Sequence, residues 1–428
     1  MSKPTPTDAS EVPPRTDTLP PADAKVPAVA VTVGFLVLGL SFMVNAMDRQ
    51  IFAPLLPTIR EEYGFSLQAG GLLATVFTLG MALAGLPAGY LVDRFSRKTV
   101  LLVSIVIYSV GTLATPLASG WASMAVYRII SGFGEGMQAA ALFAAVGAFF
   151  HRQRGLALGA LGVAFGLGVI VGPLLGVGFA ADFGTWRAPF VLFGISGLIV
   201  TLIAVFAVSR RITERSAGAA AVSDGSYDYM PPNPYNRNSI ALAVASAIGG
   251  VILYGFFGLY PTFLVSELHL TTGQSALALS FVGFGGLAGI LGGWIGDRVD
   301  QRNLLIGSLV AMSITSLLIF QVQASLGWQL VFAFLMGAFG TGVLFPNANS
   351  AIQRAVRPNQ VGRAAGLFVT CYYGPAAFSG LLFGALVARL GWRQAGLWQM
   401  TLLPLVAVVA LAFVRTSQFN NAVRQPAR

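Results

Sequence analysis

The stretch GYLVDRFSRK, residues 89–98, joins two long apolar segments at 68–92 and 99–118. A similar stretch, GWIGDR, occurs 204 residues later at 293–298 and also closes an apolar segment. A short charged turn between apolar runs of about 20 residues is typical of a hairpin of membrane-spanning helices. Because the turn recurs at the corresponding place in the second half of the chain, the sequence predicts two copies of one helical unit.

The composition of the whole chain favours a membrane protein. Its 428 residues are 55% hydrophobic and 10% charged, with a mean hydropathy of +0.74, whereas soluble proteins have about 25% charged residues. We predict an all-α membrane protein with twelve transmembrane helices. They are expected at residues 30–58, 68–92, 99–118, 121–149, 155–181, 186–209, 239–266, 272–296, 303–322, 327–352, 364–388 and 392–414.

The basic residues indicate how these helices are oriented. An even number of spans places both termini on one side, and 20 of the 26 Lys and Arg residues fall on that side. Because cytoplasmic loops are enriched in Lys and Arg, we expect a multi-pass protein of the cell inner membrane with both termini in the cytoplasm. The net charge of +10 therefore reflects orientation, and no basic run interleaved with aromatic residues predicts nucleic-acid binding.

The longest polar stretch inside the chain, residues 210–238, is expected to be a cytoplasmic linker that divides the spans six and six. We expect an N-terminal six-helix half at 28–209 and a C-terminal six-helix half at 239–415, related by pseudo-two-fold symmetry. Residues 1–27 are rich in proline and lack an apolar core, so they predict a disordered cytoplasmic tail rather than a signal peptide. Residues 416–428 are expected to form a second cytoplasmic tail.

The turn at 89–98 is similar to the loop signature of the major facilitator superfamily of transporters. The segment GLGVIVGPLLG, residues 166–176, is similar to the fifth-helix motif of that family. The resemblance extends over residues 30–415, and it implies the two-half fold, transport by alternating access and a gating role for the loop residues. These are Gly89, Asp93, Arg94, Arg97 and Lys98, with Gly293, Asp297 and Arg298 in the second copy.

The loop also has a physical interpretation. Asp93 can pair with arginines or cap a helix N-terminus across the loop, and Gly89 allows close helix contact. Breaking such contacts would accompany opening toward the cytoplasm. The alternative is that the cations of the loop only fix the topology.

Four ionisable residues lie deep inside predicted spans, all in the N-terminal half. Asp48 and Arg49 occur in the first span. Arg128 and Glu135 are seven residues apart in the fourth span, so they share one helix face, which Gln138 borders. A charge at the bilayer centre costs at least about 2.5 to 3.5 kcal/mol, so the four should face one another. Adjacent helical residues project about 100° apart, so Asp48 and Arg49 should each pair with the fourth span.

The total charge of this group favours proton coupling. Fully ionised, the four side chains sum to zero, and a proton on one carboxylate leaves a charge of +1. Such a site accepts an anion at little electrostatic cost, so proton and anion would travel together. We expect Asp48 and Glu135 to carry the protons. Two alternatives stay open: a static network that fastens the two helices, and an Arg49 that orients Asp48 instead of contacting substrate.

A second resemblance concerns the same residues. An Asp-Arg pair in the first span, with Arg and Glu seven apart in the fourth, resembles the anion:cation symporter branch of the superfamily, which includes sialin-like and hexuronate carriers. The resemblance implies that Arg128 contacts the anion or its carboxylate neighbour, and that Asp48 and Glu135 carry protons. DRQIFAPLLPTI, residues 48–59, is also similar to the spinster branch, whose members move lysolipids or related amphiphiles. The sequence does not separate the two branches.

The C-terminal half has no deep ionisable residue, so we expect it to supply shape and hydrogen bonds. Pro346 is expected to break its helix and free backbone groups for a ligand. Each tyrosine taken singly is more often a packing residue or an interfacial anchor than a ligand contact. The predicted substrate-binding residues are Arg49, Arg128, Gln138, Tyr254, Tyr260, Asn347, Asn349, Tyr372 and Tyr373.

The predicted function is secondary active transport, namely proton-coupled symport of a small organic anion, a carboxylate, by alternating access. The alternative is a proton-linked exporter of an amphiphile such as a lysolipid or a hydrophobic drug, and sodium could replace the proton. The sequence contains no nucleophile paired with a base, no ATP-binding motif and no metal-binding cluster, so we expect neither an enzyme nor a cofactor. We expect a monomer whose partners are substrate, protons and membrane lipid.

Overall fold

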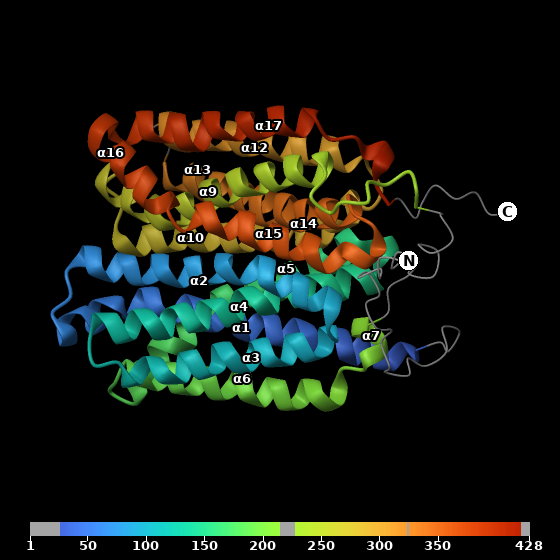
Figure 1. Cartoon of the computed structure of the whole chain (residues 1–428). Helices are drawn as coiled ribbons and strands as arrows, with labels where there is room; N and C mark the ends of the chain where they lie inside the picture. Colours follow the sequence, from blue (N-terminus) through green and yellow to red (C-terminus); the bar gives the residue numbers. More distant parts are fainter. Residues whose placement is uncertain (1–25, 215–226, 323–324, 421–428) are drawn as a thin grey trace, which may run out of the picture.

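The computed structural model describes residues 26–214, 227–322 and 325–420, and all regular structure within these ranges is helical (Figure 1). The predicted tails lie mostly outside these ranges, as does part of the predicted linker. The N-terminal half consists of α1 (Ala28–Tyr63), α2 (Leu67–Arg94), α3 (Arg97–Ala114), α4 (Trp121–Phe149), α5 (Arg154–Asp182) and α6 (Arg187–Ala207), followed by the short α7 (Arg210–Glu214).

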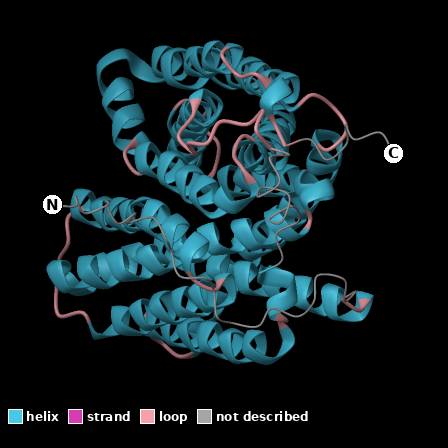
Figure 2. Cartoon of the chain, turned by 45° about the vertical axis from the view of Figure 1, so that its right-hand side comes forward, coloured by secondary structure: helices cyan, strands magenta, loops and turns pink. Residues whose placement is uncertain are grey.

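The C-terminal half repeats this plan with more interruptions. Its helices are α9 (Arg237–Ser266), α10 (Thr272–Gly286), α11 (Gly289–Gly296), α12 (Gln301–Gln321), α13 (Leu326–Gly337), α14 (Phe345–Arg354), α15 (Val361–Ala376), α16 (Ser379–Ala395) and α17 (Leu403–Ala412). π-helical turns at Ala338–Leu344 and Gly396–Leu402 join α13 to α14 and α16 to α17. In Figure 2 the two halves form two separate groups of helices, one above the other.

The described residues confirm the predicted number of spans. Eleven helical stretches are long and apolar enough to cross a membrane. The last of them, Pro358–Ala412, has 55 residues, more than two crossings of about 20 residues require. Gly391 interrupts it with φ 77°, a conformation that favours glycine. This stretch therefore contains two spans, which makes twelve.

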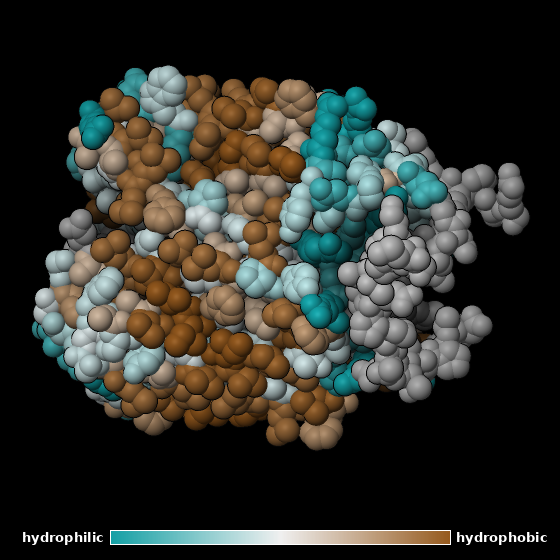
Figure 3. Space-filling view, in the orientation of Figure 1, coloured by the Kyte–Doolittle hydropathy of each residue, from teal (hydrophilic) through white to brown (hydrophobic). Residues whose placement is uncertain are grey.

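The outer surface is apolar around the middle of the bundle. Figure 3 shows a band of hydrophobic side chains over the helices, with hydrophilic residues at both ends and most densely at the right-hand end. Leu174, Phe206 and Leu291 are among the large apolar side chains exposed on the surface. Burial of this band in lipid explains why a chain with so many exposed apolar side chains is stable, because exposing that apolar surface to water would cost free energy and favour aggregation.

We call the more hydrophilic end, where α7 lies in Figure 1, the basic end. It is defined by Arg94 and Arg97 between α2 and α3, Arg298 after α11, and Arg354 and Arg363 around the turn between α14 and α15. The two halves contact each other there, α2 packing on α15 and α5 on α11. A Cβ on Gly89 would come 2.7 Å from the carbonyl oxygen of Gly362, so glycine is what allows this approach.

Two carboxylates lock the halves together at the basic end. Asp93 accepts hydrogen bonds from the backbone N–H groups of Gly362 and Arg363, at 2.8 and 3.1 Å, and pairs with the Arg363 side chain at 3.0 Å. Asp297 accepts from the backbone N–H groups of Gly155 and Leu156 at 2.8 and 2.9 Å. Each carboxylate therefore caps the N-terminus of a helix in the opposite half.

The equivalence of these two contacts follows the sequence repeat. Asp297 also pairs with Arg354 of its own half at 2.5 Å. The second copy of the loop motif thus has the same helix-capping arrangement as the first, with Gly293 packed against Gly155 where Gly89 packs against Gly362. The capping that the sequence allows for Asp93 is present, and its gating role stays a prediction.

Three basic residues of the two loop motifs bond within their own half. Arg94 donates to the Tyr90 hydroxyl at 2.7 Å, and Lys98 donates to the Val205 carbonyl at 2.7 Å. Arg298 donates to the Trp294 carbonyl at 3.0 Å and lies over its ring. These side chains therefore hold the ends of their own helices, and the contact across the halves comes from the carboxylates.

Replacing either capping carboxylate should open the basic end more often. Asp93→Asn or Asp297→Asn keeps an acceptor but removes the charge, which accounts for about half the strength of such bonds. We expect the equilibrium to shift toward the open state by about tenfold, equivalent to about 1.4 kcal/mol. The distance distribution between spin labels on the exposed Phe95 and Asn359 positions reports this shift.

The matched control is Asp228→Asn, because Asp228 of the linker pairs with Arg357 at 3.8 Å, makes no bond between the two halves within the described ranges and is 80% exposed. It should leave the distance distribution unchanged. An unchanged distribution in both Asp93→Asn and Asp297→Asn would show that these carboxylates do not control opening.

Candidate functional site

Close packing between α1 and α5 sets the position of the charged residues of α1. A Cβ on Gly172 would come 2.6 Å from the Cα of Met47, the residue next to Asp48. Gly168 and Gly176 meet α1 one turn to either side. The fifth-helix motif is therefore a packing surface that brings two backbones together. This contact leaves the opposite face of α1 to project toward α3, α4 and the C-terminal half.

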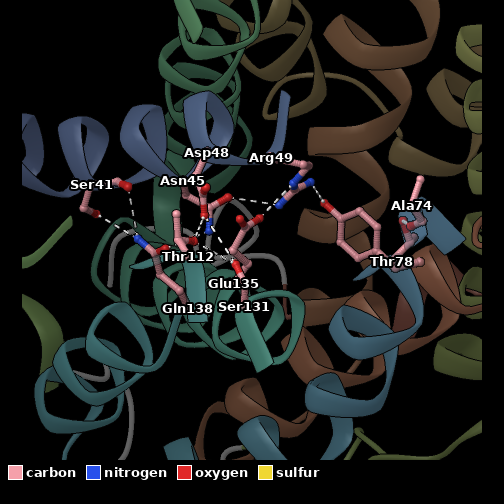
Figure 4. A network of polar contacts seen from close by, with 11 residues as sticks. Ser41, Asn45, Asp48, Arg49, Ala74, Thr78, Thr112, Ser131, Glu135 and Gln138 are labelled. Atoms are coloured by element: carbon pink, nitrogen blue, oxygen red, sulfur yellow. Dashed lines mark hydrogen bonds and ion pairs between the residues drawn. The ribbon is translucent and has the colours of Figure 1, made fainter. Parts of the chain in front are cut away.

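Arg49 is the residue that links the two halves at the centre (Figure 4). Its Nε donates to Glu135 of α4 at 3.0 Å, forming an ion pair whose side chains are 7% and 0% exposed. Its other nitrogens donate to the Asn45 side chain at 3.0 Å and to the Tyr373 hydroxyl of α15 at 3.4 Å. The predicted pairing of Arg49 with the fourth span is confirmed, and Arg49 has a further partner in the other half.

Asp48 bonds to two hydroxyl groups. Its Oδ2 accepts from the Thr112 hydroxyl of α3 at 2.5 Å and from Ser131 of α4 at 3.4 Å. Its Oδ1 is buried without a hydrogen-bond partner among the residues that the structure describes. The predicted pairing of Asp48 with the fourth span is made through the Ser131 hydroxyl, and among the described residues no ion pair joins Asp48 to Arg128. A buried carboxylate held by hydroxyls is chemically suited to accept a proton.

Arg128 is buried between two phenylalanine rings. Its guanidinium carbon lies 4.0 Å from the centre of the Phe77 ring of α2 and 4.5 Å from that of the Phe52 ring of α1. The side chain is 2% exposed, and its Nε has no hydrogen-bond partner within the described ranges. Ring faces stabilise a cation, but less than a paired carboxylate would. Arg128 therefore retains capacity to bind an anion.

A network of amides fastens α1 to α4 beside the charges. The Asn45 side chain donates to the Gln138 carbonyl oxygen at 2.8 Å. Gln138 in turn donates to the backbone carbonyl and the hydroxyl of Ser41, both at 3.2 Å. Because Asn45 also accepts from Arg49, the network holds the guanidinium in one orientation (Figure 4). Gln138 is therefore connected to Arg49 indirectly, through its hydrogen bond with Asn45.

Three of the predicted tyrosines gather on the C-terminal side of Arg49. The rings of Tyr254 and Tyr373 are 5.9 Å apart at 87°, and those of Tyr372 and Tyr373 are 5.1 Å apart at 84°. Arg49 lies 5.4 Å from the Tyr373 ring centre and 4.9 Å from that of Phe165 in α5. The wall that the C-terminal half presents to Arg49 is therefore aromatic.

The structure places the other predicted residues in different surroundings. The Tyr260 hydroxyl donates to Gln329 at 3.2 Å inside the C-terminal half. Asn347 donates to the carbonyls of Gly292 and Val343, at 2.9 and 2.8 Å, and so fastens α14 to α11. Asn349 accepts from Gln353 at 2.9 Å, near the contact of the halves at the basic end. These three residues share no contact with Arg49 or Glu135.

The expected helix break at Pro346 is wrong. The chain stays helical from Leu326 to Arg354, and a π-helical turn at Ala338–Leu344 precedes the proline. A wider turn removes the clash between the proline ring and the preceding carbonyl without freeing a whole segment of backbone.

The sequence interpretation missed Asn45, Thr112 and Phe165. Asn45 lies four residues before Arg49, a spacing that puts the two on one helix face and that could have indicated the contact. Thr112 and Phe165 carry no such signal, because a threonine or phenylalanine in an apolar span is ordinary. Their role depends on how α3 and α5 are rotated against α1.

A twelve-helix bundle of two similar halves, with paired charges buried between them, defines a membrane transporter. The family model described as Major Facilitator Superfamily matches residues 38–379 and 242–427. The chain belongs to this superfamily, and it is a transporter and not an enzyme.

Three relatives illustrate the similarity. The chain is 27% identical over 356 residues to an uncharacterised MFS-type transporter, YceJ, of Bacillus subtilis, covering 79% of this chain and 85% of the relative. It is 30% identical over 291 residues to the hexuronate transporter of the same organism, covering 65% and 67%. It is 24% identical over 345 residues to the cis,cis-muconate transport protein of Acinetobacter baylyi, covering 78% and 83%.

A solved structure supports the fold. The proton:xylose symporter XylE superposes with a TM-score of 0.74 at 15% identity, covering 90% of this chain and 95% of that chain. At this identity the likeness extends to the architecture alone.

Removing the amide network should destabilise the protein. Gln138→Leu keeps the approximate volume but leaves the buried Asn45 amide N–H without its acceptor and removes both bonds to Ser41. We expect the free energy of unfolding to fall by about 1–3 kcal/mol, measured by denaturant titration in detergent. Thr201→Val is the control, because that hydroxyl bonds only to Gly197 of its own helix, and it should change stability by less than about 0.5 kcal/mol. Equal stabilities of the two variants would contradict the role of the network.

Proposed function

We propose that this transporter carries a small organic anion, a carboxylate, together with a proton by alternating access. The observation that carries the proposal is the buried ion pair between Arg49 and Glu135, in which Arg49 also reaches Tyr373 of the opposite half. The Arg49 guanidinium therefore contacts Glu135 of the N-terminal half and Tyr373 of the C-terminal half at once. A substrate carboxylate that replaces Glu135 at this guanidinium would couple binding to movement of the halves.

The coupling follows from the cost of leaving Arg49 unpaired. A guanidinium buried in the bundle is strongly stabilised by an anion beside it, because an uncompensated buried charge is costly. Glu135 supplies that anion when it is ionised. When Glu135 takes up a proton, the carboxylate of a substrate can replace it at Arg49. Both arrangements leave the pair neutral, so the anion enters with the proton and leaves with it.

Asp48 offers a second place for a proton. It is 0% exposed and its partners are hydroxyls, which bond to either protonation state. With Asp48 and Glu135 both ionised, the group of four charges sums to zero, and each proton adds one positive charge. Arg128, held by rings alone, is then the cation that favours an ionised Asp48 or a bound anion.

Alternating access is supported by the caps at the basic end. Asp93 and Asp297 hold the halves together on that side of the site, so the site would open there only after both caps release. We propose that the basic end faces the cytoplasm of a cell with this protein in its inner membrane, because Lys and Arg gather in cytoplasmic loops.

The relatives support an organic anion as the substrate. Two of them are named for transport of hexuronate and cis,cis-muconate, both of which are carboxylates. We infer that the chain functions with substrate, protons and lipid as its partners and without a resident cofactor.

Proton coupling can be tested with purified protein in liposomes loaded with a pH-sensitive dye. Adding glucuronate, cis,cis-muconate or benzoate outside should acidify the interior for at least one acid, beyond the rate in protein-free liposomes. In Glu135→Gln we expect this acidification to fall at least about tenfold, while exchange of labelled for unlabelled anion continues, because the variant mimics the protonated site.

The control is Glu62→Gln, since Glu62 pairs with Arg187 at the surface, with exposures of 41% and 37%. It should retain acidification. If no organic acid moves protons while lysolipids or hydrophobic cations do, the symport proposal is wrong and the protein is an exporter of amphiphiles. If a sodium gradient drives transport and a pH gradient does not, the anion is still the substrate, but the proposed coupling to protons is wrong.

A further inference from the structure

We propose that the carried anion is a planar aromatic monocarboxylate rather than a polyhydroxylated sugar acid. This inference rests on the proposed function and names the class of anion that the site around Arg49 recognises. It depends on three observations: the aromatic walls, the occupied polar groups, and the single cation that faces both halves.

The walls on both sides of Arg49 are aromatic rings. Phe165 comes from the N-terminal half and Tyr373 from the C-terminal half, with ring centres 4.9 and 5.4 Å from the guanidinium carbon. Tyr254 stands edge-on to Tyr373 at 5.9 Å. An aromatic ring whose carboxylate meets Arg49 would therefore contact ring faces and edges, an arrangement that aromatic pairs prefer.

Exposure distinguishes a ligand-contacting surface from simple core packing. Tyr373 is 2% exposed and Tyr372 is 4% exposed, so these two form the base of the aromatic wall. The Arg49 side chain is 7% exposed, and Phe165 and Tyr254 beside it are partly exposed. The accessible surface near the guanidinium is thus largely the surface of rings.

The amide groups beside Arg49 already have partners within the protein. Asn45 and Gln138 bond to each other and to Arg49 or Ser41. The Thr78 hydroxyl donates to the Ala74 carbonyl of its own helix at 3.1 Å. A sugar acid brings several hydroxyls that need partners when buried, and bonding to these groups would break contacts that hold α1 on α4. An aromatic ring makes no such demand.

The charge arrangement favours one carboxylate. Arg49 exchanges one anion, Glu135, for another, so a single negative charge on the substrate restores neutrality. A second carboxylate on the opposite side of a planar molecule would lie against Tyr254 and its neighbours, where the described residues provide no further cation. Burying that charge would be costly.

Binding to the purified protein tests the inference without the leak of neutral acids across a membrane. Thermal stabilisation is titrated with benzoate, cyclohexanecarboxylate and glucuronate. We expect benzoate to bind at least about tenfold more tightly than glucuronate. Cyclohexanecarboxylate has the same charge and a similar size but no aromatic face, and it should bind less tightly than benzoate.

Tyr254→Leu locates the binding to the aromatic wall. It should weaken benzoate binding by about tenfold and leave glucuronate binding nearly unchanged. Trp328→Leu, at a position 60% exposed on the outer surface of α13, is the matched control and should not weaken either acid. If Tyr254→Leu does not fold, Tyr254→Phe and the comparison of benzoate with cyclohexanecarboxylate on the wild type decide the question.

Two results would overturn the inference. Tighter binding of glucuronate than of benzoate shows that the site selects sugar acids, and the proposed symport then stands if glucuronate carries protons into liposomes. Equal binding of benzoate and cyclohexanecarboxylate shows that the rings do not select an aromatic ligand. If no organic acid binds or carries protons, the proposed function itself is wrong, which is a separate outcome.

Discussion

The buried guanidinium of Arg49 is the constraint on which the centre of this protein depends. A cation at this depth is strongly stabilised by an anion beside it, and Glu135 provides that anion at 3.0 Å. That single contact requires α1 and α4 to keep one rotation relative to each other. The glycines of α5, which let its backbone approach α1 at Met47, and the bonds between Asn45 and Gln138 both serve to maintain it.

The contact between the halves at the basic end has a different requirement, because under the proposed alternating access it must be released in each transport cycle. It is made by carboxylates on helix N-termini, which Asp93 and Asp297 provide symmetrically, and by glycine surfaces. Such bonds are exchanged for water at modest cost, since backbone N–H groups and carboxylates are well solvated. The same chemical solution occurs twice because the six-helix unit occurs twice, and the offset of the two motifs already indicated this.

The sequence predicted the features set by lipid and by helix periodicity. Apolar length located the twelve spans, and the cost of buried charge singled out Asp48, Arg49, Arg128 and Glu135 as a group. Their individual partners depend on helix rotation and on neighbours far away in the chain, which a single sequence does not specify. Asp48 therefore bonds to Thr112 of α3 as well as to the fourth span. Asn347 fastens α14 to α11, Asn349 bonds within α14, and neither shares a contact with the charges.

The two halves differ in chemistry although they share one plan. The N-terminal half contains the four buried charges, and the C-terminal half contributes the tyrosines that face Arg49. Under the proposed function this division separates the coupling of proton and anion from the selection of the anion. The hydrogen bond between Arg49 and Tyr373 crosses the two parts. A substrate carboxylate that competes for the same guanidinium would loosen that bond, so occupancy of the site by substrate would directly favour movement of one half against the other.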